Sequence, residues 1–162
     1  MLFLTQLNLA KKRFKAIDAL AFQRYKNITE EDPSSVVVHR DLDYSDDEKE
    51  GIHFALSNVD KVDLVHIKGG TTSRMLTDIG SPPRGLFKPI NEHVGVLYTT
   101  GKTKTDGTYP GIGTPSPLEI VRCDGDTAID VLSKQAFSLT KMDWNTTRVM
   151  ISEPVTIKYA KR

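Results

Sequence analysis

Three consecutive side chains that can do chemistry, His39-Arg40-Asp41, follow the short apolar run Val36-Val37-Val38. A β-branched run of this kind predicts a buried strand. A carboxylate directly after a buried strand lies at the carboxyl edge of a sheet, where α/β proteins place their binding and catalytic groups. Asp41 is therefore the first candidate site residue, although an aspartate in this position also serves as an ordinary turn or capping residue.

Charge is unevenly distributed around Asp41, in a chain whose net charge is +1. Residues 41–60 contain seven acidic side chains and one basic side chain, whereas residues 1–40 contain seven basic and four acidic ones. An acidic stretch between basic stretches can be the solvated face of a helix, or a carboxylate-rich metal site within a surface that attracts phosphate. The four histidines show no metal-ligand spacing, so His53 and His66 are interpreted as a helix-face residue and a strand residue.

The composition is that of one folded domain. The chain has 162 residues, of which 38% are hydrophobic and 27% charged, as in ordinary globular domains. A single cysteine, Cys123, excludes an internal disulfide and a cysteine-based zinc cluster, and it indicates a reducing compartment. The apolar start of the chain is shorter than the roughly 20 residues that span a bilayer, and the basic cluster follows it, the reverse of a signal peptide. We therefore expect a cytoplasmic domain without a membrane partner.

Helix and strand signals alternate along the chain, which predicts an α/β fold with some parallel strand pairing. Ser45 followed by three acidic residues is typical of a helix start, because the hydroxyl caps the helix and the acids favour its dipole. Asp126 or Thr127 is expected to cap a later helix. The glycine- and proline-rich segment 101–117 is expected to be a long loop. The predicted strands are 36–38, 62–67, 94–99 and 118–122, and the predicted helices are 7–25, 45–57 and 126–139.

A series of short motifs from Val36 to the end of the chain resembles the PIWI domain of Argonaute proteins, and is closer to the prokaryotic members than to the eukaryotic ones. The HRD segment is similar to the strand that carries the third catalytic position of that family. The later motifs follow in the family's order at plausible spacing, and the match covers about residues 36 to 162. The motifs are VVVHRD, VHIKGGTTSR, GVLYTTG, GIGTPSPLEI, SLTKMDWNTTR and PVTIKYAKR.

The resemblance implies a partial ribonuclease H-like mixed sheet flanked by helices, with a guide and a target nucleic acid, DNA or RNA, as partners. Active members hold two Mg²⁺ or Mn²⁺ ions with carboxylates and use them for phosphodiester cleavage. By this resemblance, Asp41 aligns with a metal-binding catalytic aspartate, and Lys161 aligns with the variable fourth catalytic position. Lys68 and Arg74 fall in the family's lysine-to-arginine loop and would contact phosphate. Without the family pattern, both would be interpreted as solvated loop charges.

The chain departs from the family pattern before VVVHRD. The family's first aspartate and its glutamate finger precede this strand, where the chain has 35 residues that are interpreted as one basic helix and a loop. The early strands of the sheet, the guide-anchoring MID domain and the helix after the last motif are not recognised, and Leu42 replaces the glycine after HRD. We therefore interpret residues 1–162 as a single domain, the carboxyl-terminal portion of a PIWI domain, with clear resemblance over 35–162 and a preceding helix and loop over 1–34.

Three functions are compatible with this pattern. The first is nucleic acid binding within a guide- and target-handling PIWI domain whose catalytic site is incomplete in this chain. The second is a two-metal guided endonuclease completed by a missing or separate MID/PIWI half. The third is a truncated fragment with no independent role. We expect the chain alone to be inactive as a nuclease, because two-ion chemistry needs the carboxylates that this sequence lacks.

The final segment, PVTIKYAKR, contains conflicting signals. Its alternating β-branched residues favour a strand. The resemblance favours a helix that starts at Pro154, and proline is well suited to the first turn of a helix. We predict the helix.

Overall fold

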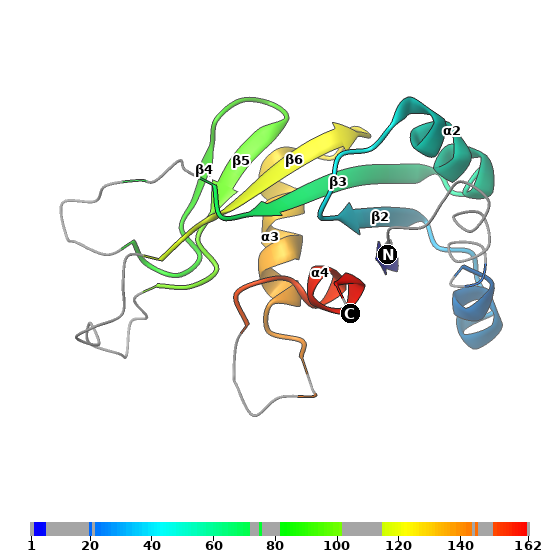
Figure 1. Cartoon of the computed structure of the whole chain (residues 1–162). Coiled ribbons are helices and arrows are strands. Elements are labelled where there is room, and N and C mark those ends of the chain that lie inside the picture. Colours follow the sequence, from blue (N-terminus) through cyan, green and yellow to red (C-terminus); the bar gives the residue numbers. More distant parts are fainter. Residues whose placement is uncertain are drawn as a thin grey trace.

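The computed structural model describes residues 2–5, 20, 22–71, 75, 82–101, 115–143, 145 and 151–161 (Figure 1). In this part of the chain, six strands form one sheet in the order β1-β2-β3-β6-β5-β4. The strands are β1 (Leu2–Thr5), β2 (Ser35–Arg40), β3 (Lys61–Gly69), β4 (Phe87–Pro89), β5 (Val94–Leu97) and β6 (Leu118–Asp124), and the helices are α2 (Asp46–Ala55), α3 (Ile129–Leu139) and α4 (Val155–Ala160).

The sheet is mixed. Strands β1, β2 and β3 run parallel to one another, whereas β3 and β6, β6 and β5, and β5 and β4 pair antiparallel. Parallel neighbours need a crossover connection, and α2 provides it between β2 and β3. The expected α/β class, a mixed sheet flanked by helices, is confirmed. The VVVH strand is β2, which lies inside the sheet between β1 and β3.

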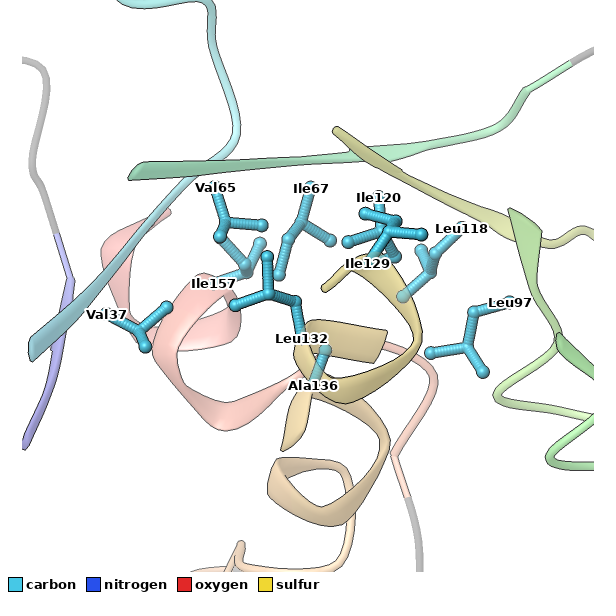
Figure 2. Packing of buried hydrophobic residues seen from close by; sticks show 10 residues of the cluster. All are labelled: Val37, Val65, Ile67, Leu97, Leu118, Ile120, Ile129, Leu132, Ala136 and Ile157. Atoms are coloured by element: carbon cyan, nitrogen blue, oxygen red, sulfur yellow. The ribbon is translucent and has the colours of Figure 1, made fainter. Parts of the chain in front are cut away.

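Both faces of the sheet are covered by helices. On one face, Val37 of β2 and Val65 and Ile67 of β3 pack toward α3 and α4 (Figure 2). On the other face, Val36 and Val38 pack with residues of α2 and its flanks. Successive side chains of a strand point to opposite faces, so a continuous apolar run suits a strand that is buried on both. Figure 1 shows α2 on one side of the sheet and α3 and α4 on the other.

Helix α2 begins and ends close to its predicted bounds. Its start is explained by the expected capping of the first turn. Ser45 is the N-cap, and Glu48 accepts a hydrogen bond from the Ser45 backbone N–H at 2.8 Å, which closes a capping box. Helix α4 confirms the prediction for the final segment, with Pro154 as its N-cap. In the part of the chain that is described, no helix combines the length and apolar character that crossing a bilayer requires.

Helix α3 corrects one prediction, since its N-cap is Ala128 and not Asp126 or Thr127. Thr127 has a different role: its backbone N–H and its hydroxyl both donate to the Asp63 carboxylate, at 3.0 and 2.6 Å. Asp63 is almost completely buried at the start of β3. The Thr127 hydroxyl is therefore hydrogen-bonded to Asp63 and does not cap α3.

The amino-terminal region corrects another prediction. It was expected to be one helix and a loop, but residues 2–5 form β1, which pairs parallel with β2 over Leu2↔Val36 to Thr5↔His39. Residues 22–29 are helical as expected, while the start of the predicted helix at Leu7 lies outside the described residues. Strand β4 was not predicted either. It is three residues long and contains a proline, which suits an edge strand.

Candidate functional site

The carboxyl ends of β2 and β3 meet at one edge of the sheet, because the two strands are parallel and paired up to Arg40↔His66. Asp41 follows β2 directly and is partly buried. Lys68 and Gly69 end β3, and both are exposed. Two of the predicted site residues, Asp41 and Lys68, thus share this edge. Arg74, the other residue predicted to contact nucleic acid, lies outside the described residues.

A buried hydrogen bond ties helix α4 to this edge. His39 Nδ1 lies 2.9 Å from the hydroxyl oxygen of Thr156, in the first turn of α4. His39 is completely buried, and this burial lowers the pKa of its ring to about 4. The ring is therefore neutral at pH 7. Because His39 is two residues before Asp41, the contact fixes the carboxyl-terminal helix close to the candidate aspartate.

Lys161 reaches the same edge through a carboxylate that the sequence analysis did not single out. Its Nζ donates to Glu153 Oε1 at 2.6 Å. The same oxygen lies 3.6 Å from the point where a Cβ on Gly69 would stand, so the ion pair lies beside the end of β3. The only sequence signal for Glu153 is an acidic residue directly before the proline that starts a helix. We refer to Asp41, Lys68, Glu153 and Lys161 as the carboxyl-edge site.

Two hydrogen bonds hold the backbone just before Glu153. The Thr99 hydroxyl, just after β5, donates to the carbonyl oxygen of Ser152. The Ile151 N–H donates to the carbonyl oxygen of Thr140, just after α3, at 3.0 Å. Pro154 follows and restricts the chain further. The backbone at Glu153 is thus held in place, whereas Lys161 carries its charge at the end of a longer and more adaptable side chain.

The acidic stretch after β2 is engaged in part by neighbouring basic groups. Glu48 accepts a hydrogen bond from Arg40 at 2.7 Å. Burial alone would raise the pKa of Glu48, but the hydrogen bonds from Arg40 and Ser45 outweigh it and hold that pKa below its usual value. Asp43 Oδ1 lies 2.8 Å from Nδ1 of the buried His66 on β3. These contacts favour a structural role for Glu48 and Asp43.

Metal-binding capacity depends on the number of nearby ligands. Across the described ranges, no group of three or more histidine, cysteine, aspartate or glutamate side chains is placed to hold a metal ion. Mg²⁺ can be held by one or two protein carboxylates with water and phosphate, but two-ion chemistry needs more.

A hollow lies at the other end of β3, away from the carboxyl-edge site. Its volume is about 500 Å³, and residues of the α2 end, the start of β3 and the end of β6 line it. Two pairs of its polar groups are in contact: His53 Nε2 lies 2.7 Å from Asp124 Oδ2, and the Asp63 carboxylate accepts hydrogen bonds from Thr127. The His53 hydrogen bond, despite some opposing burial, holds the pKa of Asp124 below its usual value. These pairs tie the end of α2 to the end of β6, and the start of β3 to the segment before α3.

Comparison with known proteins finds similarity in the fold of this chain but not in its sequence. No family model matches the sequence, and no curated protein is similar to it. Solved structures of similar fold are found, and they include Argonaute proteins. Marinitoga piezophila Argonaute, in complex with a 5′ OH guide RNA, has 20% sequence identity and a TM-score of 0.72, and the match covers 93% of this chain and 22% of that one.

Two further Argonaute structures give the same result. The A. aeolicus protein is 20% identical with a TM-score of 0.69, and the match covers 94% of this chain and 21% of that one. Clostridium butyricum Argonaute, bound to a guide DNA and a 19-mer target DNA, is 21% identical with a TM-score of 0.71 and coverages of 94% and 20%. The chain therefore has an Argonaute-like fold. It spans about a fifth of the length of the structures that it matches.

Proposed function

We propose that this chain is the carboxyl-terminal portion of a ribonuclease H-like PIWI domain and that it binds the backbone of a guide and a target nucleic acid. The observation that carries the proposal is the Argonaute-like fold over 93% of the chain, shared with a protein solved with a guide RNA. Residues 35–162 make up the PIWI-like portion and 1–34 precede it. A cytoplasmic location fits this role and remains a prediction.

The carboxyl-edge site supplies groups suited to phosphate. Lys68 is exposed, and Gly69 and Gly70 follow it in the chain, where the lack of a side chain leaves room for a close backbone approach. Gly70 also has a φ of 72°, a conformation that favours glycine. Contacts of this type recognise charge and not bases. Affinity should therefore depend strongly on salt and weakly on nucleotide sequence.

Fluorescence anisotropy with labelled DNA and RNA duplexes tests the proposal. We expect the logarithm of the affinity to fall linearly with the logarithm of the salt concentration, with a slope of about −0.9 for each neutralised phosphate. Replacing Lys68 and Arg74 with alanine should weaken binding and flatten this slope. Lys88→Ala, which removes an exposed lysine from β4 at one edge of the sheet, is the matched control and should change neither.

Two results would contradict the proposal. The first is an affinity that does not change with salt, and the second is an affinity that Lys68→Ala and Arg74→Ala leave unchanged. Absence of any binding would favour the remaining interpretation, a fragment with no independent role. Each result can be read from the same titration series.

A guided endonuclease is the second candidate function, favoured by the position of Asp41 at the carboxyl edge beside α4. In that case a missing or separate MID/PIWI half supplies the first aspartate and the glutamate finger. Asp41 would then be a ligand of Mg²⁺ or Mn²⁺, which would supply the activation of water in the completed site. Lys161 cannot be a metal ligand while protonated, since it has no free lone pair. Its ammonium would instead stabilise charge on the scissile phosphate.

A further inference from the structure

We infer that Glu153 is a built-in competitor for phosphate. In the free chain its carboxylate is hydrogen-bonded to the ammonium of Lys161, and on binding a nucleic-acid phosphate replaces the carboxylate as the partner of that ammonium. The inference rests on the proposed function and adds to it a residue that limits affinity. It follows from the Glu153–Lys161 pair at the edge where Lys68 and Gly69 end β3.

The geometry of the pair is that of a phosphate contact. A lysine ammonium at 2.6 Å from a carboxylate oxygen makes a short charge-assisted hydrogen bond, and phosphate oxygens accept the same kind of bond. The side chains of Lys161 and Glu153 are 42% and 29% exposed, so an incoming phosphate can reach the ammonium. Exposed ion pairs are weak, which makes the exchange feasible.

The other lysine of this helix shows what a structural pair looks like. Lys158 donates to Asp143, whose side chain is only 2% exposed. The same carboxylate also accepts hydrogen bonds from the Tyr159 hydroxyl at 3.0 Å and from the Asn145 N–H at 3.1 Å. Asp143 is thus enclosed by several donors. Glu153 and Lys161 lie at the surface, and their contact is exchangeable.

The two partners also differ in freedom of movement. The hydrogen bonds of Ile151 and Ser152 hold the backbone before Glu153, and Pro154 follows it. The ammonium of Lys161 stands at the end of a four-carbon side chain that can turn toward a phosphate, whereas the shorter Glu153 side chain extends from a backbone held beside Gly69. The Glu153 carboxylate then repels the bound phosphates, because like charges at short distance raise the free energy of the complex. Glu153 therefore lowers affinity both by occupying Lys161 and by its own charge.

The test is the affinity of Glu153→Gln for the labelled duplexes. We expect a gain of about three- to tenfold at low salt and a salt slope that is steeper by about one released counterion, since Lys161 becomes available. In the Lys161→Ala background, the same substitution should gain less than about twofold, because only the repulsion is relieved. Asp130→Asn is the matched control: it removes an exposed carboxylate paired with Lys134 on α3, at 3.1 Å, and should leave affinity unchanged.

The outcomes separate this inference from the proposed function. If the unmodified chain binds with the expected salt dependence but Glu153→Gln binds no more tightly than Asp130→Asn, competition by Glu153 is overturned and nucleic acid binding stands. Equal gains with and without Lys161 would also overturn it. If the unmodified chain binds no nucleic acid, titration with inorganic phosphate decides: the NMR signal of the Lys161 side chain should shift at lower phosphate concentration in Glu153→Gln than in the unmodified chain. Equal responses would contradict the inference independently.

Discussion

His39 is a neutral, buried histidine that joins β2 to α4, and its protonation is linked to folding. Its pKa is lowered from the ordinary value of 6.5 to about 4 by burial. Between these two pH values, the unfolded chain binds more protons at this position than the folded chain does. The free energy of unfolding therefore falls as the pH is lowered through this range.

We predict that the contribution of His39 to stability is fully present above about pH 6.5 and declines toward pH 4, by up to roughly 3 kcal/mol in total. Urea unfolding at several pH values measures this dependence. His39→Gln removes the titrating ring and should flatten the curve between these limits. His93→Gln changes an exposed histidine in the turn before β5 and should retain the original slope. Identical slopes in all three proteins would contradict the assignment to His39.

At the scale of elements, the turn that leads from β6 into α3 depends on a glycine. Gly125 has a φ of 97°, and a Cβ there would collide with the Asp63 carboxylate and lie 2.8 Å from the Val62 carbonyl oxygen. The same carboxylate accepts the two hydrogen bonds from Thr127. A side chain at this position would therefore disturb the start of both β3 and α3.

We predict that Gly125→Ala lowers the free energy of unfolding by about 2 kcal/mol or more, from backbone strain and the collision with Asp63. Gly51→Ala is the matched control. Gly51 is inside α2, and beyond its chain neighbours and the backbone of the helix no atom lies within 4 Å of its hypothetical Cβ, so alanine should stabilise the protein by about 0.5–1 kcal/mol. Thermal unfolding of the two variants should move the midpoint in opposite directions. A shift in the same direction would contradict the role given to the turn.

Local chemistry determined which elements could be predicted from the sequence. The starts of α2 and α4 were predictable because a capping serine and a proline act within a few residues. The short strands β1 and β4 were missed because each depends on pairing with a neighbouring strand rather than on its own residues. Glu153 was missed for a related reason. Its role depends on Lys161 and on Gly69, which is distant in the sequence and adjacent only in the fold.

At the scale of the whole molecule, the chain corresponds to about a fifth of the Argonaute structures it resembles. We predict that the 162-residue chain alone shows no cleavage of DNA or RNA that depends on a divalent metal, guided or not. In a chain restored with an upstream half, guided cleavage should appear and Asp41→Ala should abolish it. Lys161→Ala should slow it by about 10²-fold, as expected for loss of a charge-stabilising group.

A gel assay of labelled target strands, with and without Mg²⁺ or Mn²⁺, measures both parts of this prediction. Lys88→Ala again serves as the control and should cleave at the original rate. Robust guided cleavage by the isolated chain that persists in Asp41→Ala would remove both the incomplete-site interpretation and the assignment of Asp41.

The position of β3 between a parallel and an antiparallel half has a consequence for the order of folding. Its parallel partner β2 is one helix away in sequence, whereas its antiparallel partner β6 follows only after residues 70–117. Closing the shorter loop costs less conformational entropy, and non-local pairing is slow. The β2–α2–β3 unit should therefore form first and bring the ends of β2 and β3, which carry Asp41 and Lys68, to one edge early. Glu153 and Lys161 should reach this edge only when β6, α3 and finally α4 have docked. Their ion pair is therefore the last part of the carboxyl-edge site to form.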